Sequence, residues 1–359
     1  MEKNEILVIY GKDIEIMAQK LAKEADLAAM IGNRDKKIGL KPNLVSAKPA
    51  SSGATTHPQI AAGLINYLKK EGFKNITIIE GAWAGGSTQE AFNVCGYKKL
   101  AQETGVNLID TKQDKVKSCD CKGIKIDICE SALNLDFLIN LPVMKGHCQT
   151  KLTCALKNGK GLIPDSEKRR FHTIGLTKPI AHLNTVIRND FIIVDGICGD
   201  LDYEEGGNPL YAYRMYAACD PVLCDAWTAA QMGYKIDDIP YIGLAEQLGI
   251  GSADLRNVKI KELNKSSFEI VHQPSQKVKH LAPFISDNNA CSACYASLIH
   301  ALSRFDKKRL NEKICIGQGF KGKHGSLGTG QCCCGFKSFC PGCPPSGADI
   351  LKFLRNTLT

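Results

Sequence analysis

The stretch Phe137-Leu-Ile-Asn-Leu-Pro-Val-Met-Lys145-Gly-His147 begins as a short apolar run and ends in a lysine and a histidine. Apolar runs of this length are typical of strands that are buried on both faces in a parallel sheet. A second run of the same kind, Phe191-Ile-Ile-Val-Asp195, ends in a carboxylate. The sequence therefore predicts a buried sheet with polar side chains at the carboxyl ends of its strands.

Strand-like and helix-like segments alternate along the first two thirds of the chain. Strand-like Ile6–Tyr10 precedes an amphipathic stretch to about Met30, and Gly85-Gly86-Ser87-Thr88 leads into one predicted helix that runs to about Thr104. Residues 115–130 have the pattern of a hairpin, and Asp220 begins a further helix. This alternation predicts an α/β fold, a doubly wound and mostly parallel sheet with helices on both faces.

Cysteines divide the chain into two parts. Eight of the 17 cysteines lie in the last 69 residues, after a polar, proline-bearing segment at residues 273–277. A rise in cysteine content behind such a segment indicates a boundary. We therefore expect an α/β domain over residues 1–273 and a cysteine-rich module over residues 283–359.

The spacing of the late cysteines predicts a metal centre. Cys291-Ser-Ala-Cys294 and Cys340-Pro-Gly-Cys343 are two C-x-x-C pairs, and thiolates suit either zinc or an iron–sulfur cluster. The proline after Cys343 and the surplus of local thiols favour iron–sulfur. One [4Fe–4S] cluster is expected, and eight thiols would allow a second. Some of these cysteines could instead be small buried apolar residues.

Positive charge gathers in the same segment. Residues 291–359 carry ten Lys or Arg against three Asp or Glu, so most of the net charge of +9 lies near the thiols. Cations lower the cost of holding an anionic cluster. Nucleic acid is the competing explanation of this positive charge, and it is disfavoured because the segment has no readout motif and too few aromatic residues for base stacking.

Composition limits the location of the protein. The chain has 359 residues, 44% of them apolar, without an apolar run as long as the roughly 18 residues of a membrane span. Its start has no signal-peptide pattern, and its many cysteines suit a reducing compartment. We expect a cytoplasmic protein with no membrane partner.

Polar residues at the predicted strand ends indicate a ligand crevice. Because the carboxyl ends of parallel strands line the crevice of an open α/β sheet, these residues should converge, and several cations would favour a carboxylate or phosphate ligand. The predicted catalytic residues are Lys145, His147, His172 and Asp195. The predicted substrate-binding residues are Lys41, Asn43, Lys157 and Asn158. Alternatively, each lysine is a solvated surface charge, and Asp195 is a turn or capping residue.

The ordered series Leu40-Lys-Pro-Asn43, Thr56-His-Pro58, Pro142–His147, Ala155–Gly161 and Asp220–Asp225 resembles the DUF362 family. Many members of that family are described as iron–sulfur proteins. The tail lacks a ferredoxin-type cysteine run and is similar to members that end in a Cys-x-x-Cys helix, a Gly-x-Gly-x-Cys element and a Gly-Cys-Pro-Pro element. By that resemblance the ligands are Cys291, Cys294, Cys332 and Cys343, with Cys315, Cys333, Cys334 and Cys340 in reserve.

Three functions fit these features. The first is a cluster-dependent enzyme, an oxidoreductase or lyase, that acts on a small anionic substrate in the lysine-lined crevice. The second is an electron-transfer or cluster-delivery protein that docks a redox partner and has no substrate of its own. The third is a zinc-stabilised binding module. A nicotinamide-dependent enzyme is disfavoured because the dinucleotide-binding fingerprint is missing.

Overall fold

The computed structural model describes residues 1–147, 150–201, 203–207, 209–266, 271–272, 280–290 and 292–358. Its main feature is a nine-stranded sheet in the order β12-β1-β11-β10-β7-β2-β3-β4, with β13 paired to β11. The strands are β1 (Glu5–Tyr10), β2 (Ile38–Pro42), β3 (Ile76–Glu80), β4 (Asn107–Asp110), β7 (Phe137–Leu141), β10 (Phe191–Asp200), β11 (Pro209–Ala218), β12 (Lys259–Glu262) and β13 (Val271–His272).

Five neighbouring strands of this sheet, β10-β7-β2-β3-β4, run parallel. Strand β11 is antiparallel to both of its neighbours in the main order, β1 and β10. Because β2, β3, β7 and β10 point the same way, their carboxyl ends meet at one edge, where ligand crevices form. The predicted mostly parallel α/β fold is confirmed.

Helices cover both faces of the sheet. Along β1, Leu7 and Ile9 belong to one core, while Ile6 and Val8 belong to the other, as the two-residue period of a strand requires. The first core contains α1 (Ile14–Glu24), α2 (Leu27–Ile31), α3 (Pro58–Lys70), α4 (Thr88–Val94) and α5 (Tyr97–Thr104). The second contains α7 (Ala155–Asn158), α8 (Asp165–Ile174), α9 (Thr177–Leu183), α10 (Pro221–Gln231) and α11 (Pro240–Gln247).

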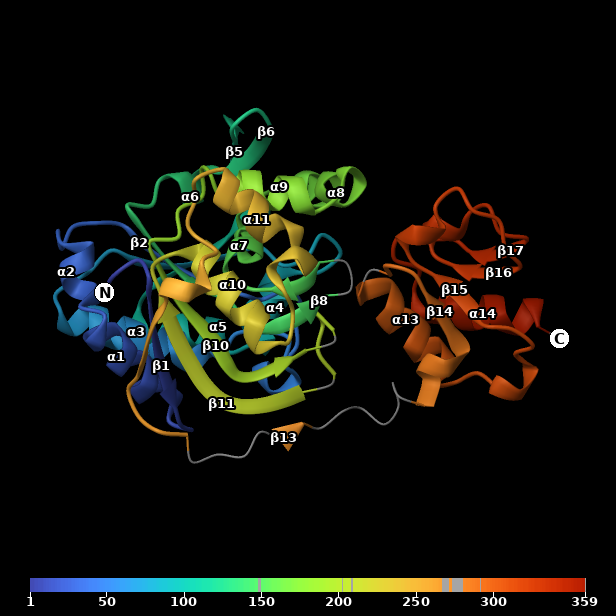
Figure 1. The fold of residues 1–359 in the computed structure, drawn as a ribbon, viewed down its shortest axis with the longest axis horizontal. Coiled ribbons are helices and arrows are strands. Elements are labelled where there is room, and N and C mark those ends of the chain that lie inside the picture. The colour runs from blue at the N-terminus through green and yellow to red at the C-terminus, as the bar shows by residue number, and fades with distance from the viewer. Residues whose placement is uncertain are drawn as a thin grey trace.

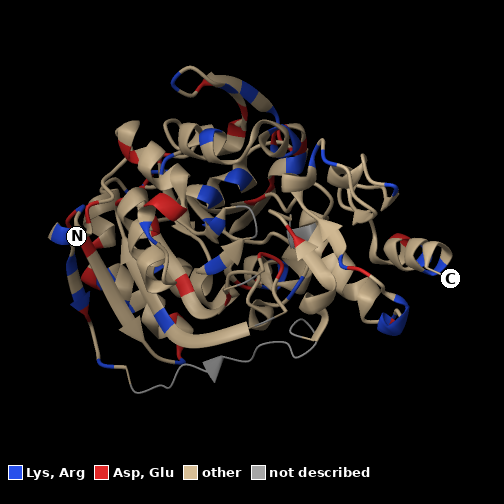
Figure 2. Cartoon of the chain, turned by 45° about the vertical axis from the view of Figure 1, so that its right-hand side comes forward, with Lys and Arg blue, Asp and Glu red and all other residues tan. Residues whose placement is uncertain are grey.

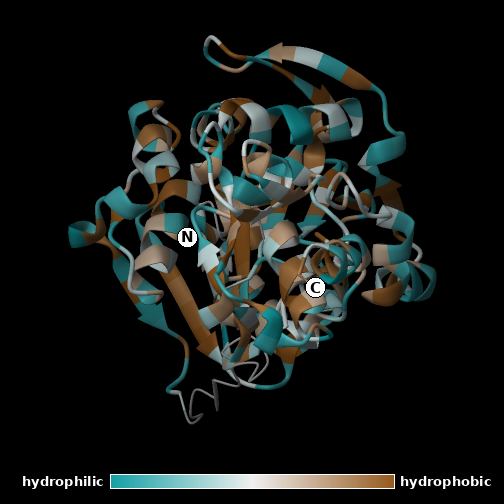
Figure 3. Cartoon of the chain, turned by 90° about the vertical axis from the view of Figure 1, so that its right-hand side faces the viewer, coloured by the Kyte–Doolittle hydropathy of each residue, from teal (hydrophilic) through white to brown (hydrophobic). Residues whose placement is uncertain are grey.

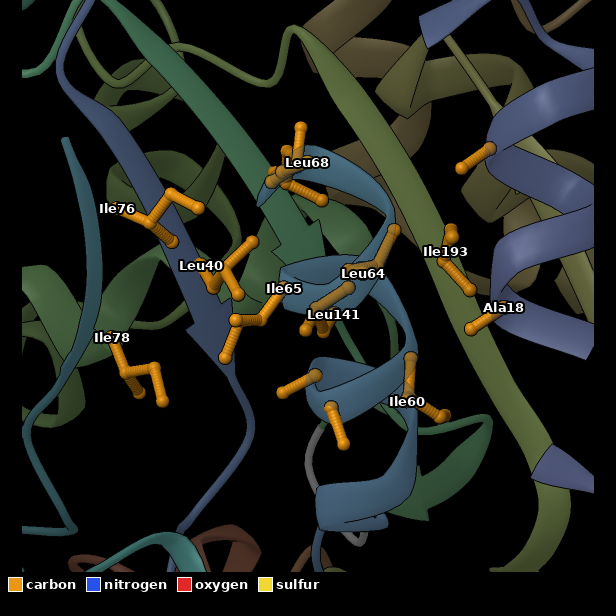
Figure 4. Close-up of a cluster of buried hydrophobic side chains, with 14 of the residues drawn as sticks. Ala18, Leu40, Ile60, Leu64, Ile65, Leu68, Ile76, Ile78, Leu141 and Ile193 are labelled. Carbon is orange, nitrogen blue, oxygen red and sulfur yellow. The ribbon is translucent and has the colours of Figure 1, made fainter. Parts of the chain in front are cut away.

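Branched aliphatic side chains dominate the first core. Figure 4 shows Ile60, Leu64 and Leu68 of α3 among strand residues that include Leu40 and Ile193. In Figure 3 the apolar strands lie inside the molecule, and many of the outer segments are polar. The sheet is thus a rigid base on which polar residues at the strand ends are held in place.

Capping residues and one glycine set the helix ends. Asp220 accepts from the backbone N–H groups of Val222 and Leu223, and Pro221 occupies the first turn of α10, as predicted. The prediction of a single helix from the Gly85–Thr88 turn to about Thr104 is wrong, because the segment is divided into α4 and α5. Gly96 lies between them with φ of +81°, a conformation that favours glycine and interrupts the helix.

Two short antiparallel pairs extend from the domain. Strands β5 (Val116–Asp120) and β6 (Lys125–Cys129) form the predicted hairpin, which projects at the top of Figure 1, and α6 (Glu130–Leu133) follows it. Strands β8 (Lys145–His147) and β9 (Lys151–Thr153) form the second pair. The second pair carries two predicted site residues, so it positions part of the candidate site.

The C-terminal cysteine-rich module has a sheet of its own. Strands β14 (Ile285–Asp287), β15 (Ile314–Ile316), β16 (Leu327–Thr329) and β17 (Ser338–Cys340) are all parallel. Helices α13 (Ser292–Leu302) and α14 (Gly347–Thr357) pack on it and share a separate apolar core. Figure 1 shows this module at the right, beside the main domain. The boundary predicted between residues 273 and 283 falls largely on residues 273–279, outside the described residues.

Charged residues are distributed over both parts of the chain, as Figure 2 shows. Within the described residues, no helix has the length and apolarity needed to cross a bilayer.

Candidate active site and metal centre

A cavity of about 640 Å³ lies between the α/β domain and the C-terminal module. The domain lines it with residues that follow β2 and β3 and with residues of β8, β9, α7 and α8. The module lines it with α13 and with the loops after β15, β16 and β17. The cavity therefore lies at the carboxyl ends of strands from two separate sheets.

Three of the four predicted metal ligands line this cavity. Cys294 comes from the first turns of α13, Cys332 from the loop after β16, and Cys343 from the loop after β17. The fourth, Cys291, lies outside the described residues. Thiols from one helix and two loops thus reach one cavity, as the ligands of a shared centre must.

Backbone hydrogen bonds hold two of these loops together. Gly330 N–H donates to Cys340 O, and Gln331 N–H donates to Gly342 O, both at 2.8 Å. Gly330 and Gly342 have φ of +87° and +131°, so each loop needs a glycine there. A Cβ on Gly330 would lie 3.9 Å from the Cys294 sulfur. The described thiols form an all-sulfur donor set, which fits a [4Fe–4S] cluster and also fits zinc.

The reserve cysteines lie elsewhere in the module. Cys333 and Cys340 are buried, and burial raises the pKa of the Cys333 thiol to about 11. Cys315 is half-buried and Cys334 is exposed. These four cysteines are not among the described residues that line the cavity. Their placement favours packing or surface roles over a second centre beside the first.

A buried hydrogen-bond network joins six of the predicted catalytic and substrate-binding residues. Lys145 Nζ donates to Asn43 Oδ1 at 3.0 Å, and Asn43 Nδ2 donates to Asn158 Oδ1 at 2.9 Å. Asn158 Oδ1 also accepts from Lys41 Nζ at 3.2 Å. Through Glu204 the same network reaches His147 and Lys157.

Glu204 is the acceptor at the centre of this network. Its Oε1 lies 2.8 Å from Lys157 Nζ, and its Oε2 lies 3.0 Å from His147 Nε2. Its backbone oxygen accepts from Lys145 Nζ at 2.8 Å. Although burial opposes ionisation, the charge of Lys157 and the hydrogen bond from His147 hold the pKa of Glu204 well below its usual value.

Lys145 lies behind the cavity wall. Its ammonium group has three acceptors, Asn43 Oδ1 and the backbone oxygens of Ala54 and Glu204. Burial lowers its pKa to about 7. All three bonds are available only to the ammonium form, because a neutral amine has two N–H groups. Lys145 is thus placed to hold the loop that carries Glu204.

Lys41 also lies behind the wall, in a buried ion pair with Glu80. Burial lowers the pKa of Lys41 and raises the pKa of Glu80, and their mutual attraction opposes both shifts. Glu80 lines the cavity, whereas Lys41 is not among its described lining residues. The pair joins the ends of β2 and β3.

Asp195 is fully buried and pairs with a histidine that our sequence reasoning did not select. Its Oδ2 accepts from both the backbone N–H and the Nδ1 of His57, each at 2.8 Å. Burial lowers the pKa of His57, but the charge of Asp195 outweighs this effect and raises it. Asp195 is also absent from the described cavity lining, and it fixes the start of α3.

The cavity lining is rich in cations. Lys160, Lys168, Arg169 and Lys321 line it, and His172 Nε2 lies 3.4 Å from Lys160 Nζ. The ammonium group of Lys168 already has acceptors within the protein, since it donates to the backbone oxygens of Gly81 and Ala82 and to Asp165. With Lys157, five cations line the cavity against the three carboxylates of Glu80, Glu204 and Glu205, so the described lining has an excess of positive charge.

Asp225 is not among the described residues that line the cavity. It is fully buried and accepts from the backbone N–H groups of Ala155 and Leu156, so it caps α7. Burial raises its pKa to about 7. Its carboxylate and the sulfurs of Cys154 and Cys224 lie within 4.8 Å of one another. Asp225 thereby positions the helix that carries Lys157 and Asn158.

Sequence reasoning missed two acidic residues of the site, Glu80 and Glu204. Each follows or ends a strand, as the predicted lysines do, and Glu204 precedes Gly206-Gly207. A search of the strand ends for carboxylates as well as for cations would have found both.

The chain was compared with known proteins. The family described as "Domain of unknown function (DUF362)" matches residues 38–230. A thylakoid-associated protein of Synechocystis, sll1697, is 23% identical over 181 residues, which are 49% of this chain and 54% of that protein. The chain thus spans about half the length of the curated relative it matches. The lactate racemase apoprotein of Thermoanaerobacterium thermosaccharolyticum is similar at 12% identity with a TM-score of 0.39, over 59% of this chain and 54% of that chain.

The family match covers the part of the α/β domain that carries Lys41, Lys145 and Glu204, and it ends before the cysteine-rich module. The cavity is therefore built partly from residues of the matched region and partly from residues beyond it.

Proposed function

The chain belongs to the DUF362 family, and from that premise we propose that it is an iron–sulfur enzyme that acts on a small carboxylate or phosphate. The observation that carries this proposal is the composition of one cavity. Cys294, Cys332 and Cys343 line it together with Lys157 and Lys160. An electron carrier needs the thiols, but it does not need a cavity beside them that can hold a small molecule.

The thiols suit a [4Fe–4S] cluster held by Cys294, Cys332 and Cys343, with Cys291 as the proposed fourth ligand. When bound, such a cluster supplies an electron or acts as a Lewis acid. The local excess of lysine and arginine offsets its negative charge.

The remaining lining residues divide into binding and proton-transfer roles. Lys160, Arg169 and Lys321 attract and bind the anion, because charge-assisted hydrogen bonds are strong in a partly dehydrated cavity. His172 lies beside Lys160 and is the better candidate for proton transfer. His147 has both ring nitrogens engaged, by Thr150 N–H and by Glu204. The cavity lining is supported by three buried residues that are not among its described members, Lys41, Lys145 and Asp195.

The first experiment measures iron, sulfide and zinc in protein purified without oxygen, with EPR spectra before and after reduction. About four irons and four sulfides per chain, with a signal after reduction, would support one [4Fe–4S] cluster. One zinc and no iron would overturn the proposal in favour of the zinc-stabilised module.

The second experiment tests the cavity. Malonate and inorganic phosphate should raise the melting temperature by mass action, and Lys160→Met should abolish the increase. Lys99→Met is the matched control, because Lys99 is 79% exposed on α5. A cluster-loaded protein whose melting temperature responds to neither anion would favour the electron-transfer or cluster-delivery alternative.

A further inference from the structure

The carboxylate of Glu204 already occupies an anion-binding position inside the cavity. Glu204, Lys157 and His147 all line the cavity, and each oxygen of the carboxylate receives one donor. This is the arrangement that a bound carboxylate ligand would adopt between an ammonium and an imidazole.

The two donors are fixed by other contacts. Lys157 is 2% exposed and its ammonium also donates to Thr153 Oγ1 at 2.9 Å. His147 is 3% exposed and its Nδ1 accepts from Thr150 N–H at 3.1 Å. Because Nδ1 is an acceptor, the ring proton is on Nε2 and points to Glu204. The pair is thus a preformed site rather than two mobile side chains.

The charge of this pair fits a carboxylate better than a phosphate. A histidine that accepts at Nδ1 is neutral, and burial lowers the pKa of His147 to about 4, so it stays neutral near pH 7. One ammonium then balances one negative charge. Phosphate near neutral pH carries between one and two negative charges and has more oxygens than the two donors can satisfy.

We propose that Lys157 and His147 form the carboxylate-binding subsite of the active site, and that Glu204 occupies it until the carboxylate of a substrate takes its place. This inference rests on the proposed function and narrows its substrate class from anions in general to carboxylates.

The position of Glu204 allows this exchange. Its side chain is 21% exposed to the cavity side, whereas its backbone oxygen is held by Lys145. The side chain can therefore rotate away while the loop stays in place. Lys145 acts in this scheme as a positioning residue, because it contacts the backbone of Glu204 rather than the incoming ligand.

The test compares Glu204→Gln with Glu205→Gln in the full chain. Glu205 is a matched control, because it also lines the cavity, its side chain is likewise 21% exposed, and its loss removes the same charge. Titrations with sodium acetate and with inorganic phosphate give the affinities. We expect Glu204→Gln to bind acetate at least tenfold more tightly than wild type, with a smaller gain for phosphate. Glu205→Gln should change both affinities less than threefold.

Equal gains in the two variants would overturn the inference, because they would show a general effect of charge. Weaker acetate binding in Glu204→Gln would also overturn it, since Glu204 would then support the ligand rather than compete with it. As a second measurement, acetate should shift the imidazole NMR signals of His147 but not those of His57. If acetate and phosphate bind through Lys160 without these effects, only the subsite is wrong and the proposed function stands. If neither anion binds any variant, the proposed anionic substrate is wrong as well.

Discussion

The rings of Tyr203 and Tyr295 stack with their centroids 5.4 Å apart. Tyr203 precedes Glu204 in the loop after β10, and Tyr295 follows Cys294 in α13. Tyr203 also packs against the apolar core of the C-terminal module. One aromatic contact thus links the loop of the anion site to the helix that carries a proposed cluster ligand.

Removing this contact should loosen the attachment of the module. Stacked aromatic pairs contribute about 0.5–1.5 kcal/mol beyond the burial of their surface, so Tyr203→Ala should lower stability by at least that amount. We expect faster proteolysis around the module and a lower melting temperature. Tyr211→Ala is the control, because Tyr211 stacks on Tyr213 within β11, at a centroid distance of 5.8 Å. Equal effects of both variants would assign Tyr203 no special role between the two parts.

Cysteine substitutions should separate ligands from packing residues. Replacing Cys294, Cys332 or Cys343 by serine should lower bound iron more than tenfold, since a four-thiolate cluster loses a ligand. Cys334→Ser and Cys315→Ser should retain iron, because these residues lie outside the described cavity lining. Iron and sulfide analysis together with visible absorbance measures the difference. Loss of iron in the control variants alone would require a different ligand set.

Lys41 should contribute to stability rather than to ligand affinity. Removing one partner of a buried ion pair typically costs about 3–5 kcal/mol, because the other charge is left without compensation. Lys41→Met should therefore lower the free energy of unfolding by about this amount, and Lys41→Met combined with Glu80→Leu should recover most of it. Denaturant titrations measure both. Normal stability with lost acetate binding would instead make Lys41 a substrate-binding residue, as first expected from the sequence.

Acid should destabilise the protein through His147. Burial is the main cause that lowers its pKa to about 4, below the ordinary 6.5. The folded protein then binds fewer protons than the unfolded chain, so this contribution is complete above pH 6.5 and is lost as the pH falls toward 4. The shift corresponds to at most about 3 kcal/mol. The contribution of His57 to stability depends on pH in the opposite direction, because its raised pKa favours the folded state at lower pH.

The variant His147→Gln isolates this effect. Its amide can still donate to Glu204, but it does not titrate in this range. The difference in free energy of unfolding between wild type and variant should therefore change between pH 6.5 and pH 4, as measured by denaturant titration. A difference that is constant across this range would contradict the assignment.

Sequence patterns predicted the fold of the α/β domain well. Apolar runs such as Phe191–Val194 are long enough to mark strands, and a polar residue directly after a run marks a strand end. The burial of the site residues was harder to predict from the sequence. Lys41 lies near the end of β2 and Lys145 begins β8, but both are buried. Glu80, on a neighbouring strand, pairs with Lys41, and the backbone oxygen of Glu204, in the loop after β10, accepts from Lys145.

The sheet of the C-terminal module was missed for a different reason. Its strands, such as Ile314–Ile316 and Leu327–Thr329, have three residues each. Such strands are too short to show a period, and glycines and cysteines between them favour loops by composition. These short strands are instead defined by parallel pairing between segments that are far apart in the sequence.

The separate apolar core of the C-terminal module bears on how metal would enter. Leu298 of α13, Ile314 of β15 and Ile350 of α14 form this apolar core, and the cavity thiol of Cys294 packs against its edge. In small zinc domains, by contrast, metal binding and folding are one event. Here the scaffold around the cysteines has its own source of stability. A preassembled cluster would therefore be inserted into a module that is already folded. Mild chelation should remove the cluster, leave the module folded, and allow it to bind a cluster again.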